Sequence, residues 1–298
     1  MIVKKIDMHM HCSDIVEFPG FKGLASPEDV GAMYEKLGVE KGVVLPGGAT
    51  SECAINSMST REVRAMVEKY SSVIGWWFMP IDPRNITNSP KSDFSFLIQH
   101  YMAQGARGIS ELSANLPLDD PKMMNMFSYC EKFRLPVILH FGQNGWGYGV
   151  IDDLHLPRLE KVLAAFPQLP VLGHSMAFWT EFGNDTTEEN RHDYLTGPVK
   201  GEGRAVQLMR KYRNLYADLS AMSGYSALMR DKEFTYAFLE EFQDQIVYAT
   251  DIATADWIDK PQANLSSFLD EAVEDGRISQ VAYEKICRRN ALRLLKEE

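Results

Sequence analysis

The sequence lacks the features that mark membrane and secreted proteins. No stretch approaches the roughly 20 uninterrupted apolar residues that a membrane helix needs. The first residues, MIVKKIDMHMH, show neither the apolar core nor the small-residue cleavage site of a secretory signal. The four cysteines are scattered and form no CxxC pair, which favours free thiols over a disulfide framework. We therefore expect a cytoplasmic protein that does not contact a membrane.

Positive charge is also scarce. Lys and Arg number 31 against 41 Asp and Glu, which gives a formal net charge of −10. Because nucleic acids reward clustered Lys and Arg, the composition argues against a nucleic-acid partner. It does not exclude an anionic substrate, since a bound metal ion can attract an anion locally. The expected partner is a small-molecule substrate, and nothing in the composition forbids a homo-oligomer.

The order of the predicted elements indicates a barrel. Short β-rich runs alternate with stretches of helical spacing, and runs such as VILH and IVYA are continuously apolar, as strands buried on both faces are. An open doubly wound sheet would usually carry a GxGxxG turn after the first strand, where this chain reads HCSDIVEFPG. We predict a single (β/α)₈ TIM-barrel domain over residues 1–298. The expected strands are 3–9, 41–46, 73–81, 106–112, 136–141, 170–174, 215–219 and 246–250, and the expected helices are 27–37, 60–69, 94–104, 121–133, 156–166, 202–212, 234–242, 262–274 and 279–296.

Polar residues gather at the ends of the expected strands. His9, His11, His140 and His174 lie at strand ends, and Asp251 directly follows the eighth strand. In such barrels the carboxyl ends of the strands form the catalytic face, so residues far apart in sequence converge there. Any one of these histidines could be a core residue hydrogen-bonded to the backbone. A purely structural role in the core does not explain well why five such residues share one face.

His9 and His11 have the spacing of a metal chelate. Side chains at positions i and i+2 of a strand point the same way, which directs both imidazoles into the barrel mouth and Met8 and Met10 toward the helices. Such a pair suits Zn²⁺, Mn²⁺ or Fe²⁺. We predict a divalent metal ion, zinc before manganese or iron, held by His9, His11, His140 and Asp251.

The segments around these residues resemble the amidohydrolase superfamily, specifically the group that contains both hydrolases and non-oxidative decarboxylases. The matching pieces are, in chain order, IDMHMH, RLPVILHFG, LPVLGHS, NLYADLSA, IVYATDIA and the closing RRNALRLL. The resemblance spans the whole chain. It implies a TIM barrel with a metal centre, but it does not specify a reaction.

The resemblance also implies roles for the ligands. His9, His11 and Asp251 would bind the first metal ion. His140 would complete that site in members with one ion, or bind a second ion in members with two. His174 would be a ligand of the second ion, or, beside a single ion, a catalytic base or a group that polarises the substrate carbonyl.

The fourth strand bears on the choice between one ion and two. Members with two ions usually carry a carboxylated lysine there, and some use glutamate. Here the strand reads GARGISELS, without lysine, and Glu111 near its end is a candidate bridging ligand. The alternative interpretation makes Glu111 a carboxylate that pairs with Arg107 or another cation.

Such a centre suits chemistry at a carbonyl group. A divalent ion can lower the pKa of bound water from about 15.7 to roughly 7. Asp251 would then be both a ligand and the acceptor of the water proton, while His174 would stabilise the oxyanion or protonate the leaving group. We predict a hydrolase of an amide, ester or lactone. The alternatives are a metal-dependent non-oxidative decarboxylase of a small carboxylic acid, and a non-catalytic barrel that binds a metal ion or ligand.

Three loop residues are predicted to contact the substrate. Arg230 is a candidate anion clamp, because guanidinium binds carboxylate through two parallel hydrogen bonds; otherwise it would be a surface arginine paired with Asp231 or Glu233. Trp146 belongs to the glycine-rich segment GQNGWGYGVIDDLH, which suits a mobile lid. Trp179 belongs to a long polar loop after the sixth strand. Aromatic side chains at these places suit a planar or sugar-like substrate, and equally suit packing against the barrel rim.

Overall fold

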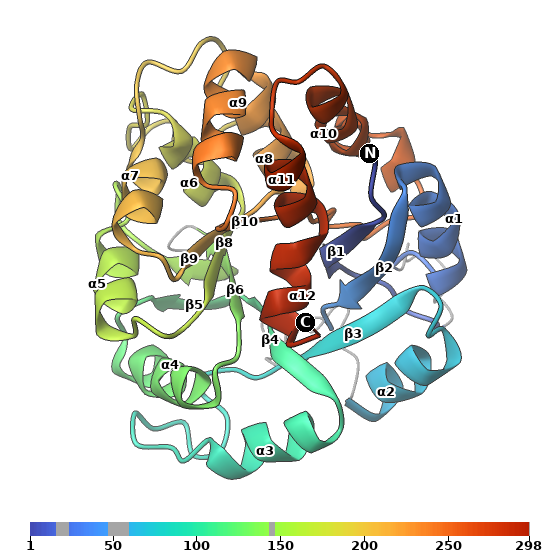
Figure 1. Cartoon of the computed structure of the whole chain (residues 1–298). Coiled ribbons are helices and arrows are strands. Elements are labelled where there is room, and N and C mark those ends of the chain that lie inside the picture. The colour runs from blue at the N-terminus through green and yellow to red at the C-terminus, as the bar shows by residue number, and fades with distance from the viewer. Residues whose placement is uncertain (16–23, 47–59, 143–146, 298) are drawn as a thin grey trace.

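Eight parallel strands form a nearly closed barrel with helices around it (Figure 1). The structure is a computed structural model that describes residues 1–15, 24–46, 60–142 and 147–297. The barrel strands pair in the order β1-β2-β3-β4-β6-β8-β9-β10, and a parallel bridge between Met10 and Ile252 joins the two ends of this series. The predicted TIM barrel is therefore confirmed. The strand bounds are β1 Lys5–Met10, β2 Val39–Val44, β3 Ile74–Met79, β4 Ala106–Leu112, β6 Val137–Gly142, β8 Val171–His174, β9 Leu215–Asp218 and β10 Ile246–Val247.

Some of the helices, α1 and α4 among them, begin where the sequence supplies capping residues. Ser26 and Asp29 form a capping box at the start of α1, and Pro27 occupies its first turn. Asp120 accepts a hydrogen bond from the backbone of Lys122 at the start of α4. The helices that surround the barrel are α1 Pro27–Leu37, α2 Thr60–Lys69, α3 Ser95–Ala103, α4 Pro121–Phe133, α5 Pro157–Ala165, α7 Arg204–Lys211, α9 Lys232–Glu241 and α10 Leu265–Glu274, followed by α11 Gln280–Glu284 and α12 Asn290–Leu295. Two further helices, α6 Met176–Trp179 and α8 Ala221–Met229, lie where loops were expected.

A small second sheet lies beside the barrel and was not predicted. Its strands are β5 Ala114–Pro117 and β7 Gly149–Ile151, and β7 pairs with both β5 and the barrel strand β6. Gly149 has φ 81°, and a Cβ placed there would lie 2.5 Å from the backbone of Gly142. The described part of the glycine-rich segment is thus bound to a barrel strand, and the expected lid stays a prediction. Trp146 lies outside the described residues.

The barrel interior is filled by apolar side chains from the strands and from the last helix. They are Ile6, Met8, Val43, Leu45, Phe78, Ile138, Leu172, Val247 and Ala249, together with Ala291, Leu294 and Leu295. α12 (red in Figure 1) therefore packs against the interior, whereas a second and larger cluster joins the strands to the surrounding helices.

The prediction that Met8 faces the helices is wrong, although Met10 does belong to the outer cluster. The pairing register of β1 with β2 shifts between Asp7 and Met10. Such an irregularity breaks the strict alternation of side chains along a strand. Met8 points into the barrel interior together with Ile6, two positions before it, and the irregularity beyond Asp7 places Met10 in the outer cluster and lets His9 reach the site at the strand end.

None of the described helices combines the length and the apolar character needed to cross a bilayer. The three cysteines in the described ranges, Cys12, Cys130 and Cys287, are buried free thiols, as expected. Cys53 lies outside those ranges.

Replacing Gly108 with alanine tests how tightly the interior is packed. Gly108 is buried in β4, and a Cβ there would approach ring carbons of Phe78 to 2.6–2.8 Å. Because a close-packed core adapts poorly to added volume, we expect Gly108→Ala to lower the free energy of unfolding by about 1–3 kcal/mol in urea titrations. The matched control is Gly75→Ala in β3, whose Cβ would come no nearer than 3.3 Å to its neighbours, two side-chain carbons of Lys41. Equal stability of the two variants would contradict this account of the core.

Candidate metal centre

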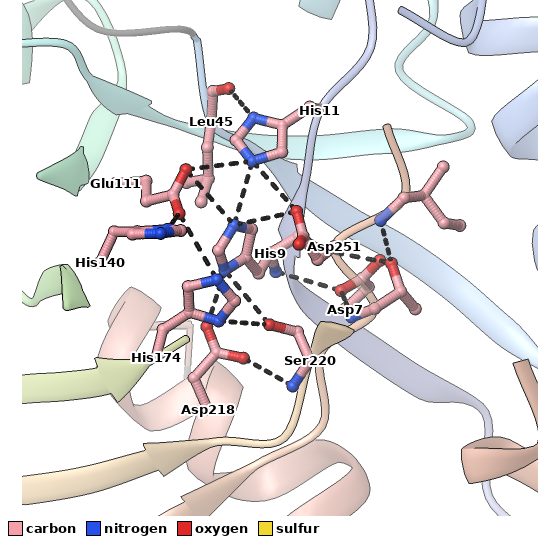
Figure 2. Close-up of polar contacts among 12 residues, drawn as sticks. Asp7, His9, His11, Leu45, Glu111, His140, His174, Asp218, Ser220 and Asp251 are labelled. Atoms are coloured by element: carbon pink, nitrogen blue, oxygen red, sulfur yellow. Dashed lines mark hydrogen bonds and ion pairs between the residues drawn. The ribbon is translucent and has the colours of Figure 1, made fainter. Parts of the chain in front are cut away.

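His9, His11 and Asp251 meet at the junction of the first and last barrel strands (Figure 2). The Nε2 atoms of His9 and His11 lie 3.0 Å apart. Asp251 Oδ1 lies 3.3 Å from His11 Nε2 and 3.6 Å from His9 Nε2. Asp251 adopts a left-handed conformation with φ 57°, and its N–H donates to the His9 carbonyl oxygen over 2.7 Å. Two ring nitrogens and one carboxylate oxygen thus face a common point.

Three of the imidazoles form a hydrogen bond through Nδ1, the ring nitrogen that faces away from the site. Nδ1 of His9 lies 2.7 Å from Asp218 Oδ2, that of His11 lies 2.8 Å from the Leu45 carbonyl oxygen, and that of His174 lies 2.9 Å from Ser220 Oγ. A carbonyl oxygen only accepts hydrogen bonds, so it fixes the His11 proton on Nδ1 and leaves the Nε2 lone pair facing the site. This anchoring of the far ring nitrogen is the usual support of metal-binding histidines.

Glu111, at the carboxyl end of β4, lies among all four histidines of the site. Its Oε2 is 3.4 Å from His11 Nε2 and 4.0 Å from His9 Nε2. Its Oε1 is 2.5 Å from His140 Nδ1 and 3.5 Å from His174 Nε2. The alternative pairing with Arg107 is wrong, because Arg107 binds Glu297 instead.

His140 and His174 therefore lie on the side of Glu111 opposite His11. The ring centroids of His140 and His174 are 5.2 Å apart, and those of His9 and His174 are 4.6 Å apart. Among the described residues, two groups bring three ligand atoms within 4.8 Å of one another: His9, His11 and Asp251, and His9, Glu111 and His174. His140 contacts Glu111 rather than the first of these groups.

The charged groups of the site shift one another's pKa values. Burial disfavours the charged form of His9, but the carboxylates of Asp218, Asp251 and Glu111 together outweigh it and raise the pKa of His9 to about 9. Burial and the neighbouring His9 lower the pKa of His174 to about 4. Burial alone would raise the pKa of Glu111, yet His140 and His11 hold it well below its ordinary value. Without a metal ion, protons on imidazole compensate the buried carboxylates.

The structure adds residues that the sequence reasoning did not single out. Asp218 and Ser220, at the end of β9, orient His9 and His174, and the N–H of Ser220 donates to Asp218 Oδ1 over 2.9 Å. Asp218 could have been found by the argument used for Asp251, because it too ends a barrel strand, in NLYADLSA. Tyr148 reaches the site from the small second sheet, and no sequence signal predicts that contact.

Of the predicted substrate residues, Arg230 and Trp179 lie in the described part of the chain, and each is bound to another part of the protein. The Arg230 guanidinium binds the Asp185 carboxylate, with Nη2 2.5 Å from Oδ2, and not Asp231 or Glu233. It lines a cleft that Tyr194 also lines. Trp179 is 3% exposed, and its indole N–H donates to the Asp218 carbonyl oxygen over 3.1 Å, so it is a core residue that supports the end of β9.

Comparison with solved structures supports the fold. The chain is similar to an amidohydrolase from Burkholderia multivorans with bound zinc, at 11% identity over 99% of both chains and a TM-score of 0.63. It is also similar to 2,6-dihydroxybenzoate decarboxylase from Rhizobium, at 15% identity over 99% of both chains and a TM-score of 0.54. A third similar structure is a dihydroxybenzoic acid decarboxylase from Polaromonas sp. JS666, with bound manganese and the inhibitor 2-nitroresorcinol. The identity is 14%, the alignment covers 99% of this chain and 97% of the decarboxylase, and the TM-score is 0.56.

These identities are too low to carry more than the fold. Comparison with curated proteins gives no match. The sequence as a whole, however, matches the family model described as Amidohydrolase over residues 6–296. That match covers nearly the full barrel, including all of the candidate ligands, and agrees with the resemblance noted from the sequence. The chain belongs to the amidohydrolase family.

Proposed function

We propose that the protein is a metal-dependent hydrolase that attacks the carbonyl group of a small amide, ester or lactone. The observation that carries the proposal is the position of the Glu111 carboxylate, with one oxygen toward His11 and the other toward His140 and His174. A carboxylate in that position suits a bridge between two ions.

The donor set fits divalent metal ions. His9, His11 and Asp251 would hold the first ion, and Glu111 and His174, with His140 beside them, would hold the second. Imidazole and carboxylate ligands suit zinc, and manganese and iron are also compatible with them. The zinc in the Burkholderia relative and the manganese in the Polaromonas relative support this choice of metals.

Bound ions would supply a Lewis acid for the carbonyl oxygen and a water of lowered pKa. The residues of the chain then have separate tasks. The Asp251 carboxylate is partly exposed, and the oxygen that is not a ligand can accept the proton of the attacking water. Burial keeps His174 neutral at pH 7, so its ring can act as a ligand. Beside a single ion, the same neutral ring would be a catalytic base.

Decarboxylation of a small carboxylic acid is the second candidate, supported by the two decarboxylases of similar fold. An arginine near the pocket would favour that reaction, because its guanidinium could bind the substrate carboxylate. Arg230 was the residue predicted for this role, and its charge is already compensated by Asp185. Hydrolysis is therefore the first choice.

The substrate class, the cellular compartment and the oligomeric state are the remaining proposals. We propose a small molecule as the substrate, in keeping with the inhibitor bound by the Polaromonas relative. The buried thiols suit a reducing cytoplasm. A homo-oligomer stays a prediction.

A substrate screen of the metal-loaded protein separates the candidate functions. Esters, lactones and amides are followed by acid release in weakly buffered solution, and aromatic and aliphatic carboxylic acids by CO₂ release. Acid release from the first set supports the hydrolase. CO₂ release alone identifies the decarboxylase, and a metal-bound protein that turns over neither set is the non-catalytic binder.

Metal content tests the assignment of the first ion. We expect His9→Ala and Asp251→Ala to lose the metal that the wild-type protein retains through gel filtration, because each removes a ligand from the group at the β1–β10 junction. Atomic emission spectrometry measures the ratio of metal to protein. His100→Ala, an exposed residue of α3, is the matched control. Wild-type metal content in either ligand variant would refute the assignment.

The anchoring carboxylate should tune affinity without being a ligand. Asp218→Asn keeps the shape of the side chain but weakens the acceptor for His9 Nδ1. We expect metal affinity to fall by about 10–100-fold in competition with a chromogenic chelator. The exposed Asp275→Asn serves as control. An unchanged affinity would show that Asp218 does not support His9 in metal binding.

The number of ions tests the bridging role of Glu111. We expect two equivalents of metal in the wild-type protein and one in Glu111→Gln, because an amide bridges two cations poorly. Hydrolysis should fall by at least about 10²-fold, as expected for loss of electrostatic stabilisation. One equivalent in both proteins would instead favour the single-ion arrangement.

A further inference from the structure

A narrow cleft adjoins the candidate metal centre beyond the ends of β8 and β9. One wall belongs to α6, which begins two residues after His174. The other belongs to α8, whose N-cap residue Ser220 places its Oγ 2.9 Å from His174 Nδ1 (Figure 2). The Trp179 indole, at the end of α6, donates to the carbonyl oxygen of Asp218, the residue that contacts His9. The segments that orient the candidate ligands therefore also form the cleft.

Two serine side chains in the cleft wall have no hydrogen-bond partner. Ser223 and Ser226 lie on successive turns of α8, and Ser223 is 5% exposed. Both Oγ atoms are buried without a hydrogen-bond partner in the described part of the chain. Leaving a buried hydroxyl unpaired is costly, because it has given up its hydrogen bonds to water. A polar group that enters the cleft and bonds to these hydroxyls would remove that cost. The remaining lining is largely apolar, with Met176, Trp179, Leu195 and Ala227.

The charges around the cleft disfavour an anionic group. Arg230 lines the cleft, but its Nε donates to the Gly197 carbonyl oxygen over 2.8 Å and both of its Nη atoms bind the Asp185 carboxylate. The positive charge is therefore compensated, and the exposed Asp193 adds a carboxylate to the lining. The cavity volume is about 10 Å³, which is room for roughly one water-sized group. An uncharged hydroxyl group meets both conditions.

Tyr194 connects the cleft with the metal centre. Its side chain lines the cleft and is 48% exposed. Burial and the charge of Asp251 raise the pKa of Tyr194, so the phenol and the candidate ligand share one electrostatic environment. A small substrate whose carbonyl group lies at the centre can therefore extend a substituent into the cleft.

We propose that the cleft is a substrate subsite that binds a hydroxyl group, with Ser223 and Ser226 as its hydrogen-bond partners. This rests on the proposed hydrolase function and deepens it, because it names hydroxyl-bearing esters, lactones or amides as the substrate class. The two serines determine specificity and take no part in bond cleavage. A substrate with a methyl group in place of the hydroxyl has nearly the same shape, but it leaves both serine hydroxyls unpaired.

Matched substrate pairs test the proposal. One member of each pair carries a hydroxyl group where the other carries a methyl group, on the acyl part (lactate against isobutyrate esters) or on the alcohol part (ethylene glycol against propyl esters). For the metal-loaded wild-type protein, kcat/KM is corrected for the rate of each ester with hydroxide ion. We expect it to favour the hydroxyl member of at least one pair by about 10–100-fold, the usual cost of an unpaired buried polar group. In the double variant Ser223→Ala, Ser226→Ala, this preference should disappear.

Ser266→Ala is the matched control, because Ser266 is a similarly buried serine on α10 whose hydroxyl donates to the Leu37 carbonyl oxygen over 2.6 Å. It should keep the wild-type preference while unfolding at a lower urea concentration. The double variant should unfold at no lower concentration than the wild-type protein, since it loses no hydrogen bond.

Two results would overturn the proposal: equal corrected rates for both members of every pair in the wild-type protein, or an unchanged preference in the double variant. Release of CO₂ without hydrolysis of any ester, lactone or amide refutes the proposed function, and this inference with it. Hydrolysis without a preference for the hydroxyl member refutes the inference alone.

Discussion

The hydrogen bonds that close the barrel run through the backbone of the candidate ligands themselves. The Asp251 N–H donates to the His9 carbonyl oxygen, and the His11 N–H donates to that of Ile252, each over 2.7 Å. Behind them the buried Asp7 carboxylate accepts from the backbone N–H groups of both His9 and Thr250. Residues at opposite ends of the chain are therefore brought together by the same contacts that complete the fold. Any loosening of this junction would separate the two halves of the candidate site formed by His9, His11 and Asp251.

Much of this arrangement follows from local sequence patterns. The bounds of α1, α2 and α4 agree with the predicted helices, because capping residues and prolines define where α1 and α4 begin. The convergence of His9, His174 and Asp251 follows from the geometry of parallel barrels, in which the carboxyl ends of strands share one face. Burial on both faces marks the barrel strands, so their order could be predicted as well.

The rest depends on partners that no local pattern specifies. Arg230 pairs with Asp185, which is 45 positions away in the chain, so a free guanidinium and a compensated one look the same in the sequence. Trp179 was expected in a loop, but a short helix turns its indole toward the Asp218 carbonyl oxygen. The glycine-rich segment around Tyr148 suggested a lid because glycine permits motion, and in the structure Gly149 permits the close approach of two strands. Composition cannot distinguish these two uses of glycine.

The balance of charge explains why the position of Glu111 bears on the reaction. Three carboxylates contact the imidazoles, those of Glu111, Asp218 and Asp251, and their pKa values are all lowered, so all three are ionised at neutral pH. Their combined charge exceeds that of one divalent ion and is less than that of two. A centre with one ion would thus stay net negative unless an imidazole kept its proton, whereas a centre with two ions would be net positive. The second arrangement would place more positive charge beside a substrate carbonyl oxygen, which supports the bridging role proposed for Glu111 and the hydrolysis proposed with it.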